Sequence, residues 1–255
     1  MVLAAACLAH AAEDRFPRVA EAYLVKRDGR VLWAGAPEAR MAPASLTKMM
    51  TALLVLELGR LDEVVTVSRA ASRETGSHIG LKAGDQLRVH DLLAATIVRS
   101  ANDACRALAD HLGPTTAAFV SKMNQRAASL YLKNTHFTDP CGHDHARQYS
   151  TATDLARLGE QVVQHAEYVR LAGVPHMNIR TVDRRRSFWL NNTNALIGRY
   201  DGAMGIKTGY TWRAGNCLVA LAERDHVQVL VVMLNAPNRW WNAVGLMDRA
   251  FEARP

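Results

Sequence analysis

The segment from residue 43 to residue 58 constrains the fold more than any other part of this 255-residue chain. It reads PASLTKMMTALLVLEL, with Pro43 suited to a first helical turn and Gly59 following as a C-terminal stop. Its apolar residues point in nearly every direction around a helix axis, which is typical of a helix buried on all sides. The pattern therefore predicts a helix that runs through the centre of the protein.

Lys48 is the residue of this helix that needs a reason, because an unpaired charge is costly among apolar side chains. Ser45 lies three residues earlier, so the two side chains share one helix face and can reach hydrogen-bonding distance. Burial disfavours the charged form of an amine, which would make Lys48 a base towards the Ser45 hydroxyl. The pair predicts a nucleophile and its base, although an SxxK match alone is expected roughly once by chance in such a chain.

Two further short motifs carry groups suited to chemistry. Ser100-Ala101-Asn102 joins two predicted helices, where capping alone would account for its hydroxyl and amide. Lys207-Thr208-Gly209 lies on a predicted strand and offers a fixed positive charge, a hydroxyl, and a glycine that lets a substrate lie along the strand edge. Together the groups of the second motif are suited to recognise the carboxylate of a peptide.

The remaining pattern predicts strands at both ends of the chain and helices between them. Residues 22–25 and 31–33 flank Asp28-Gly29, a pair suited to a tight hairpin turn. This arrangement predicts one α/β domain with a helical lobe and an active-site cleft. The further predicted elements are helices over 89–98, 102–112, 115–132, 151–169 and 239–251, with Asn102 and Thr115 as N-caps, and strands over 204–210, 217–222 and 227–234.

The surface is expected to be basic, since 31 Lys and Arg outnumber 24 Asp and Glu. Such a surface attracts anionic polymers and carboxylate-ended peptides as well as nucleic acid, and we find no nucleic-acid-binding motif. Residues 184–186, the one tight arginine cluster, are interpreted as a solvated face. We therefore predict no nucleic-acid partner.

Residues 1–12, MVLAAACLAHAA, form an apolar run whose end, Ala9-His10-Ala11, has the form of a signal-peptidase site. The run lacks a positively charged beginning, and a buried N-terminal strand is the alternative. We interpret it as the remnant of a signal peptide, which predicts export to the periplasm or another extracytoplasmic space. No later stretch approaches the ~20 continuous apolar residues of a membrane-spanning helix, so no transmembrane segment is expected.

The cysteines and histidines predict neither a disulfide framework nor a metal site. Cys105, Cys141 and Cys217 show no CxxC spacing and are expected to be small core or loop residues. The run from Cys141 through His143 to His145, with His136 nearby, has metal-ligating residue types without a standard spacing. We interpret it as an ordinary polar loop and predict no metal or other cofactor.

The ordered triple of SxxK, SxN and KTG is the signature of penicillin-binding proteins and serine β-lactamases. Longer stretches resemble the low-molecular-weight D-alanyl-D-alanine carboxypeptidase family, and the resemblance runs from about Ala22 to Phe251. It implies an antiparallel sheet flanked by helices, a mainly helical lobe, and an active-site cleft between them. The stretches are APASLTKMMTALLVLELGRLDE, GSHIGLKAGDQLRVHDLL, SANDACRALADHL, THFTDPCGHDHARQYSTATDLA and DGAMGIKTGYTWRAGNCLVALAER.

The resemblance also implies catalytic roles. Ser45 would be the nucleophile and Lys48 its general base, while Ser100 and Asn102 would complete a proton relay and hold the substrate amide. The middle residue of the SxN motif is Ala101, where glycine is frequent in the family, and this departure should be tolerated.

Substrate binding is assigned by the same resemblance to the KTG strand. Lys207 and Thr208 would bind the terminal carboxylate, and Gly209 would let the substrate approach. The backbone N–H groups of Ser45 and Tyr210 would form the oxyanion hole. Arg239 is a further candidate for the carboxylate on a loose local match, with a surface arginine as the favoured alternative.

The function implied is that of a serine D-Ala-D-Ala carboxypeptidase, which removes the terminal D-alanine of peptidoglycan stem peptides and which β-lactams inhibit covalently. A D,D-endopeptidase of crosslinks and a β-lactam-sensing or wall-binding domain without turnover stay open as alternatives. A class A β-lactamase is disfavoured because no ExxLN loop follows the SxN motif and Glu160 falls within a predicted helix. Residues 20–255 are predicted to form the catalytic domain, without the C-terminal β-rich domain of many relatives.

Overall fold

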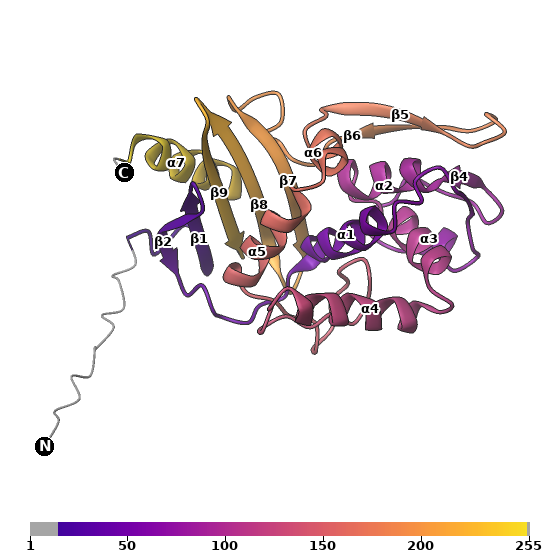
Figure 1. Cartoon of the computed structure of the whole chain (residues 1–255), viewed down its shortest axis with the longest axis horizontal. Coiled ribbons are helices and arrows are strands. Elements are labelled where there is room, and N and C mark those ends of the chain that lie inside the picture. The colour runs from indigo at the N-terminus through magenta and orange to yellow at the C-terminus, as the bar shows by residue number, and fades with distance from the viewer. Residues whose placement is uncertain (1–14, 254–255) are drawn as a thin grey trace, which may run out of the picture.

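The computed structural model describes residues 15–253 of the chain. Its largest sheet is five-stranded and antiparallel, with the order β2-β1-β9-β8-β7 (Figure 1). The predicted leader, residues 1–12, lies outside the described residues. The strands of this sheet are β1 Ala22–Arg27, β2 Arg30–Gly35, β7 Ala203–Thr211, β8 Gly215–Arg224 and β9 Val227–Leu234.

Alternate residues of the central strands face two different cores, as the period of a strand requires. On β8, Val219 and Leu221 join the larger core beneath the helices, whereas Leu218 and Ala220 join a smaller core. The smaller core is covered by α7 (Arg239–Glu252), and the opposite face of the sheet is covered by α5 (Ala152–Val162). The sheet is therefore buried on both faces.

The rest of the chain forms a mainly helical part beside β7 (Figure 1). It also contains two small antiparallel sheets, β3-β4 and β5-β6. Its elements are the 3-10 helices η1 Ala44–Thr47 and η2 Ala71–Arg73, the helices α1 Lys48–Leu58, α2 Val89–Val98, α3 Asn102–Leu112, α4 Thr116–Ser129 and α6 Ala166–Ala172, and the strands β3 Val64–Thr66, β4 Gln86–Arg88, β5 His176–Arg180 and β6 Ser187–Asn191.

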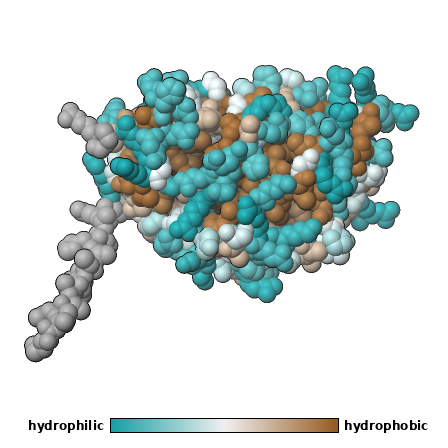
Figure 2. All heavy atoms as spheres, viewed as in Figure 1, coloured by the Kyte–Doolittle hydropathy of each residue, from teal (hydrophilic) through white to brown (hydrophobic). Residues whose placement is uncertain are grey.

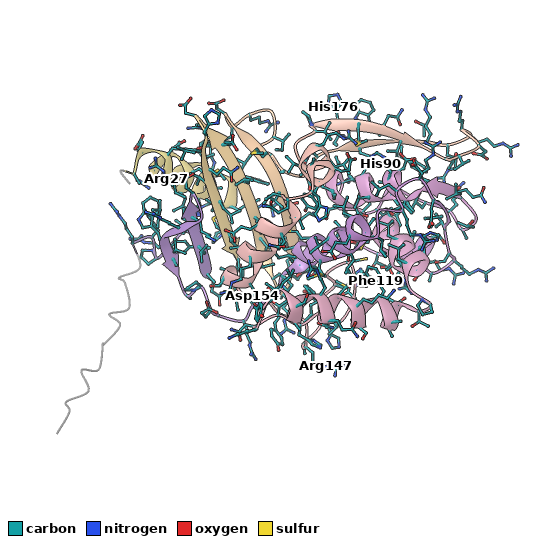
Figure 3. All side chains as sticks on the ribbon, viewed as in Figure 1. Arg27, His90, Phe119, Arg147, Asp154 and His176 are labelled. Carbon is teal, nitrogen blue, oxygen red and sulfur yellow. The ribbon has the colours of Figure 1, made fainter. Side chains whose placement is uncertain are left out.

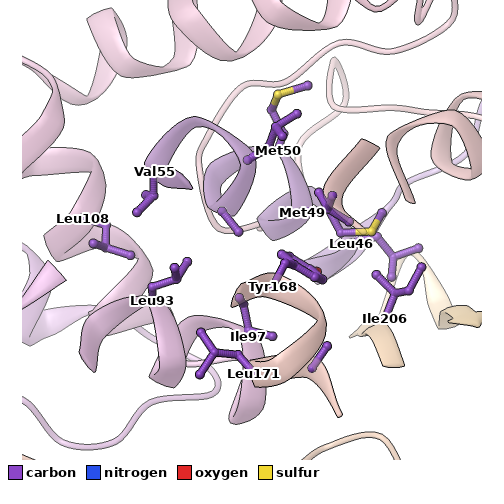
Figure 4. Packing of buried hydrophobic residues seen from close by; sticks show 14 of the residues in the cluster. Leu46, Met49, Met50, Val55, Leu93, Ile97, Leu108, Tyr168, Leu171 and Ile206 are labelled. Atoms are coloured by element: carbon purple, nitrogen blue, oxygen red, sulfur yellow. The ribbon is translucent and has the colours of Figure 1, made fainter. Parts of the chain in front are cut away.

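Helix α1 lies at the centre of the larger core, as its all-round apolar pattern predicts. Figure 4 shows its Met49, Met50 and Val55 among side chains from α2, α3, α6 and β7. Gly59 ends the helix in the left-handed conformation with φ 65°, which confirms the predicted stop. The first turn is a 3-10 helix rather than α-helix, so Ser45 lies on η1 and Lys48 begins α1.

Several predicted elements are confirmed. The β1-β2 hairpin turns at Asp28 and Gly29, both with positive φ, and Thr115 caps α4 by accepting a hydrogen bond from the Ala118 N–H at 3.1 Å. Helices α2 and α3 have the predicted bounds, and α7 and the three C-terminal strands match theirs closely.

Two predictions about the helical middle are wrong, and one pair of strands there was not predicted. Asn102 does not cap α3, because Ala101 holds the N-cap position and the Asn102 side chain bonds elsewhere. The single helix over 151–169 is two helices, since α5 packs on the sheet through Gly159 whereas α6 brings Ala172 against Gly205 of β7. The β5-β6 hairpin was not predicted, and residues 184–186 lie in its turn.

Polar contacts tie the loops to this framework. Asp154, labelled on α5 in Figure 3, is buried and accepts hydrogen bonds from the Asn134 N–H and the Thr135 hydroxyl at 2.8 Å each. Hydrophilic residues cover most of the face seen in Figure 2, with hydrophobic residues showing between them towards its middle. Within residues 15–253, none of the helices has the length and apolar character to cross a membrane.

Candidate active site

Ser45 and Lys48 meet at the junction of η1 and α1. Lys48 is buried, with 1% exposure, and its Nζ lies 2.9 Å from the Ser45 Oγ. The same nitrogen lies 2.7 Å from Asn102 Oδ1 and 2.6 Å from the Cys141 carbonyl oxygen. The three neighbours hold the amine in one place, beside the Ser45 hydroxyl.

The identity of these neighbours determines what the amine can do. The oxygens of Asn102 and Cys141 are carbonyl oxygens and can only accept hydrogen bonds, so they take two N–H groups. The Ser45 hydroxyl can donate as well as accept. In a neutral Lys48 the remaining lone pair therefore faces Ser45, which is the arrangement a general base needs.

Asn102, the first residue of α3, is fixed by backbone groups of the preceding loop. Its Nδ2 donates to the Thr75 carbonyl oxygen at 2.6 Å, and its backbone N–H donates to the Ser77 carbonyl oxygen at 2.6 Å. A Cβ on Gly76 would come within 3.0 Å of Nδ2, so this loop needs a glycine there. Since Nδ2 is committed as a donor, Oδ1 is the atom that points to Lys48.

Ser100 and Lys207 form a second hydroxyl and amine pair on the other side of the site. The Lys207 Nζ lies 2.8 Å from the Ser100 Oγ and 2.9 Å from the Thr208 carbonyl oxygen. Ser100 has a positive φ of 60°, at the bend between α2 and α3 that turns its side chain towards β7. Lys207 is buried, with 2% exposure, although it carries a charge in its ordinary state.

The KTG strand lies directly against η1. A Cβ on Gly209 would lie 3.1 Å from the Ala44 Cβ and 3.2 Å from the Ser45 backbone nitrogen, so a side chain here would push the two segments apart. Thr208 shares a hydrogen bond of 2.8 Å with the Thr193 hydroxyl. The close approach brings the backbone that follows Gly209 next to Ser45.

Arg239 is not a surface arginine, contrary to the interpretation favoured from the sequence. It is partly buried at the start of α7 and donates hydrogen bonds to the Gly209 carbonyl oxygen at 2.8 Å and the Cys217 carbonyl oxygen at 3.3 Å. Its guanidinium also lies over the Trp240 ring, 4.5 Å from the centroid. Arg239 therefore braces the KTG strand from behind.

The site concentrates basic side chains, and none of them has an acidic hydrogen-bond partner among residues 15–253. The hydrogen-bond partners of Lys48, Lys207 and Arg239 are all uncharged oxygens. Burial lowers the pKa of Lys207 well below its usual range, and the charges of Lys48 and Arg239 lower it further. Burial also lowers the pKa of Arg239. A bound anion would relieve this repulsion, so the geometry favours a carboxylate ligand.

Comparison with known proteins identifies a family that matches most of the chain. Residues 16–238 match the family model described as D-alanyl-D-alanine carboxypeptidase. The chain belongs to this family. Its α/β architecture, with an antiparallel sheet and flanking helices, is that of the penicillin-binding serine peptidases, as the resemblance implied.

Relatives in the D-alanyl-D-alanine carboxypeptidase family cover most of the chain. DacF of Bacillus subtilis is 37% identical over 222 residues, which are 84% of this chain and 57% of that protein. DacC of Escherichia coli is 35% identical, over 82% of this chain and 54% of that protein. The chain thus spans little more than half the length of these relatives. A D-alanyl-D-alanine carboxypeptidase of Streptomyces sp. strain K15 is 32% identical, with 88% of this chain and 83% of that protein covered.

Solved structures in the family agree in fold. The crystal structure of the Streptomyces K15 DD-transpeptidase superposes with a TM-score of 0.87 at 30% identity, covering 92% of this chain and 98% of that one. The carboxypeptidase DacD of Francisella tularensis gives a TM-score of 0.85 at 28% identity, covering 92% of this chain and 70% of that one.

The structure adds groups to the site that the motifs of the family do not contain. The Cys141 carbonyl contacts Lys48, and the Asp103 carboxylate accepts hydrogen bonds from the backbone N–H groups of residues 79–81, which fixes the loop beside Asn102. Thr193 contacts Thr208. A backbone carbonyl leaves no signal in a sequence, but Asp103 and Thr193 are polar residues whose neighbours only the fold reveals.

The loop from Asp139 to His145 is built around one carboxylate. Asp139 accepts hydrogen bonds from the N–H groups of Cys141, Gly142 and His143 at 2.7, 2.8 and 3.1 Å. The other two histidines point elsewhere: His145 at the end of the loop and His136 before it both contact the Arg147 backbone. Among residues 15–253, no group of His, Cys, Asp and Glu side chains is arranged to hold a metal ion.

Proposed function

We propose that this protein is a serine D-Ala-D-Ala carboxypeptidase that removes the terminal D-alanine of peptidoglycan stem peptides through an acyl-enzyme on Ser45. One observation carries the proposal: the Ser45 hydroxyl is the hydrogen-bond donor available to a buried Lys48 amine whose other two neighbours are carbonyl oxygens. The KTG strand beside it offers the buried Lys207 for the substrate carboxylate, and Arg239 of α7 adds a second positive charge nearby.

In the acylation step, Lys48 takes the Ser45 proton as the Ser45 Oγ attacks the carbonyl carbon of the penultimate residue. Negative charge develops on the carbonyl oxygen, which the N–H groups of Ser45 and Tyr210 stabilise. The contact of Gly209 with the Ser45 backbone supports this pairing. Removing one such donor typically costs ~2.7–4 kcal/mol of transition-state stabilisation.

The departing D-alanine needs a proton on its nitrogen. Ser100 is suited to supply it, because Lys207 donates to its oxygen and leaves the hydroxyl hydrogen free for the substrate. Asn102 holds the substrate amide, while Lys207 and Thr208 bind the terminal carboxylate with Arg239 behind the strand. The Lys48 ammonium then passes the proton it took from Ser45 to Ser100, which restores the neutral amine and the Ser100 hydroxyl. Water hydrolyses the ester with Lys48 again as the base, and the proton taken from the water returns to the Ser45 Oγ.

β-Lactams are expected to acylate Ser45 and to leave slowly. Their leaving amine stays attached to the acyl group after the ring opens, so it cannot diffuse away as D-alanine does. Glu160 was the candidate from the sequence for the deacylating glutamate of a class A β-lactamase, but here it forms an ion pair with Lys26 of β1. It lies on α5 and has no contact with Ser45 or Lys48.

The proposed substrate places the protein outside the cytoplasm, where peptidoglycan stems are exposed. The apolar run of residues 1–12 supports export, and the excess of Lys and Arg over Asp and Glu suits an anionic wall. The proposed partners are stem peptides ending in D-Ala-D-Ala, with β-lactams as covalent inhibitors. No cofactor takes part in the proposed reaction.

Transfer of the acyl group to an amine is the second candidate. The Streptomyces K15 structure, of which 98% is covered by the match, is named a DD-transpeptidase, whereas the family description names a carboxypeptidase. Both reactions share the acyl-enzyme and differ only in whether water or an amine releases it. A D,D-endopeptidase would use the same residues with a wider space for the leaving group.

The test is product analysis with diacetyl-Lys-D-Ala-D-Ala, with and without added glycine as an amine acceptor. We expect D-alanine release and the shortened peptide, little glycine adduct, and a loss of at least about 10³-fold in Ser45→Ala. Ser72→Ala, an exposed serine bonded to the Arg69 carbonyl, should keep full activity. A dominant glycine adduct would favour transfer, and release undiminished in Ser45→Ala would refute the mechanism.

A further inference from the structure

Two of the buried cysteines lie in contact beside the catalytic lysine. The Sγ atoms of Cys105 and Cys141 are 2.7 Å apart, and both residues are buried. Nonbonded carbon atoms approach to about 3.5–4.0 Å, so this is a close contact. A disulfide has a sulfur separation of about 2.05 Å, which the pair can reach with a shift of well under 1 Å.

The pair joins two segments that both shape the site. Cys105 lies on α3, one turn after Asn102, and Cys141 lies in the loop whose carbonyl accepts the Lys48 hydrogen bond at 2.6 Å. The sulfurs also contact the opposite backbones, with Cys105 Sγ 3.2 Å from the Pro140 carbonyl oxygen and Cys141 Sγ 3.6 Å from the Asn102 carbonyl oxygen. A bond between them would tie this loop to α3.

We propose that Cys105 and Cys141 form a disulfide that clamps the Cys141 carbonyl against Lys48. The oxidant is a disulfide of the glutathione or dithiol-carrier type. One cysteine thiolate attacks the oxidant and releases one of its thiols, and the second cysteine then attacks the mixed disulfide and releases the other. Two protein thiols are oxidised, one external disulfide is reduced to two thiols, and both electrons go to the oxidant.

The burial of the pair determines when the bond forms. Burial raises the pKa of the Cys141 thiol well above its usual range, and the neighbouring Cys105 raises it further. Since the thiolate is the attacking species, exchange is slow once the chain is folded at neutral pH. The bond is therefore expected to form during folding, before the loop closes over α3.

The test compares the full chain refolded with oxidised glutathione and refolded with a phosphine reductant. Free thiols are alkylated in denaturant, and peptides are mapped by mass spectrometry without reduction. We expect a crosslinked peptide joining Cys105 and Cys141 in the oxidised sample alone. If the chain does not refold, native protein is incubated with oxidised glutathione at pH 9 in urea below the unfolding midpoint, where local opening exposes the two thiols.

Thermal unfolding supplies a second readout. The bond would join residues 36 positions apart and so close a long loop of the unfolded chain. Because opening that loop destabilises the folded state relative to the unfolded one, reduction should lower the melting temperature by about 5–10 °C. Cys217→Ser, which removes the third buried thiol, should keep the crosslink and the shift, whereas Cys141→Ser should lose both. Recovery of Cys105 and Cys141 as alkylated free thiols from wild-type protein that had folded with oxidised glutathione would overturn the proposal, as would a crosslink to another cysteine.

Discussion

At the scale of single residues, the site depends on Lys48 and Lys207, which are both buried but have different hydrogen-bond partners. The Lys48 amine has three oxygen neighbours, two of which can only accept. Lys207 has two, and burial together with two nearby cations lowers its pKa. The first lysine is placed to accept a proton from Ser45, and the second is placed to meet an anion.

Lys207→Met should therefore weaken activity on carboxylate-ended peptides while stabilising the fold. Hydrogen bonds to charged groups contribute about 1.5–3 kcal/mol, so kcat/KM should fall by roughly 10–100-fold. Because the folded state disfavours the charged form of Lys207, its removal should raise the melting temperature at neutral pH. The measurements are kcat/KM and thermal unfolding of both proteins.

A C-terminal amide on the substrate provides the control for this prediction. Wild-type protein should prefer the carboxylate, and Lys207→Met should lose most of that preference. Arg213→Met removes an exposed positive charge four residues after Gly209 of the KTG motif. It should change neither the preference for the carboxylate nor the melting temperature greatly. An unchanged preference in Lys207→Met would show that another group binds the carboxylate.

The motif residues could be found from the sequence because their chemistry was out of place. Lys48 stood out in an apolar helix, and the three motifs occur in a fixed order. The Cys141 carbonyl could not be found, because every residue has a carbonyl and only the fold brings this one to Lys48. The same holds for Thr193, which lies in a loop without a recognisable motif and whose hydroxyl shares a hydrogen bond with Thr208.

At the scale of elements, the site depends on how closely β7 approaches η1. Gly209 makes this approach possible, since a Cβ there would lie 3.1–3.2 Å from Ala44, Pro43 and Ser45. The glycine is therefore needed for a contact between two elements and not only for its own conformation. Gly209 therefore sets the relative position of Ser45 and the KTG strand, the proposed substrate-binding strand.

Gly209→Ala should shift η1 away from β7 by a few tenths of an ångström. Acylation should slow by up to about 10²-fold, the loss that a 1 Å misplacement can cause. Gly245→Ala is the matched control, because no atom lies within 4 Å of the added Cβ in α7. The control should raise the free energy of unfolding by about 0.5–1 kcal/mol with unchanged activity. The rate of penicillin acylation measures the first effect, and equal rates in both variants would refute it.

The loop from Asp139 to His145 is stabilised by a pair of titrating groups. The hydrogen bond to Asp139 raises the pKa of His143, against partial burial, which lowers it, and nearby Glu74 adds to the rise. For Asp139, burial raises the pKa, but hydrogen bonds from His143 and the loop backbone outweigh it and lower the pKa overall. The pair contacts Asn102 through the His143 ring, 3.3 Å from Nδ2.

This pair predicts a pH dependence of stability. The contribution of His143 is complete below the ordinary histidine pKa of about 6.5 and is lost as the pH rises through its raised value. The contribution of Asp139 is complete above about 3.9 and is lost as the pH falls through its lowered value. Urea unfolding of wild type and His143→Gln from pH 5 to 9 should show a stability difference that shrinks as the pH rises.

His226→Gln, at an exposed turn, controls for the change of side chain from histidine to glutamine itself. A difference between wild type and His143→Gln that grew towards pH 9 would contradict the assignment.

At the scale of the whole molecule, the sequence predicted the sheet and the central helix because their periods are strong. Residues of β8 and β9 alternate between two cores, and α1 is apolar on all sides. The β5-β6 hairpin was missed because its strands are five residues long and mix polar with apolar residues. The break between α5 and α6 was missed because neither glycine nor proline lies at it. The two helices are separate because they pack at different places on the sheet, α5 against β7 and β8 and α6 against Gly205 of β7.

Every step of the proposed reaction depends on Ser45 as the nucleophile, and penicillin labelling identifies the residue that is acylated. After reaction with penicillin, trypsin should release the peptide of residues 41–48 carrying the mass of the opened antibiotic on Ser45. The adduct should be absent in Ser45→Ala and should form far more slowly in Lys48→Ala, which should stay folded. An adduct on another residue, or undiminished labelling of Ser45→Ala, would contradict the central claim.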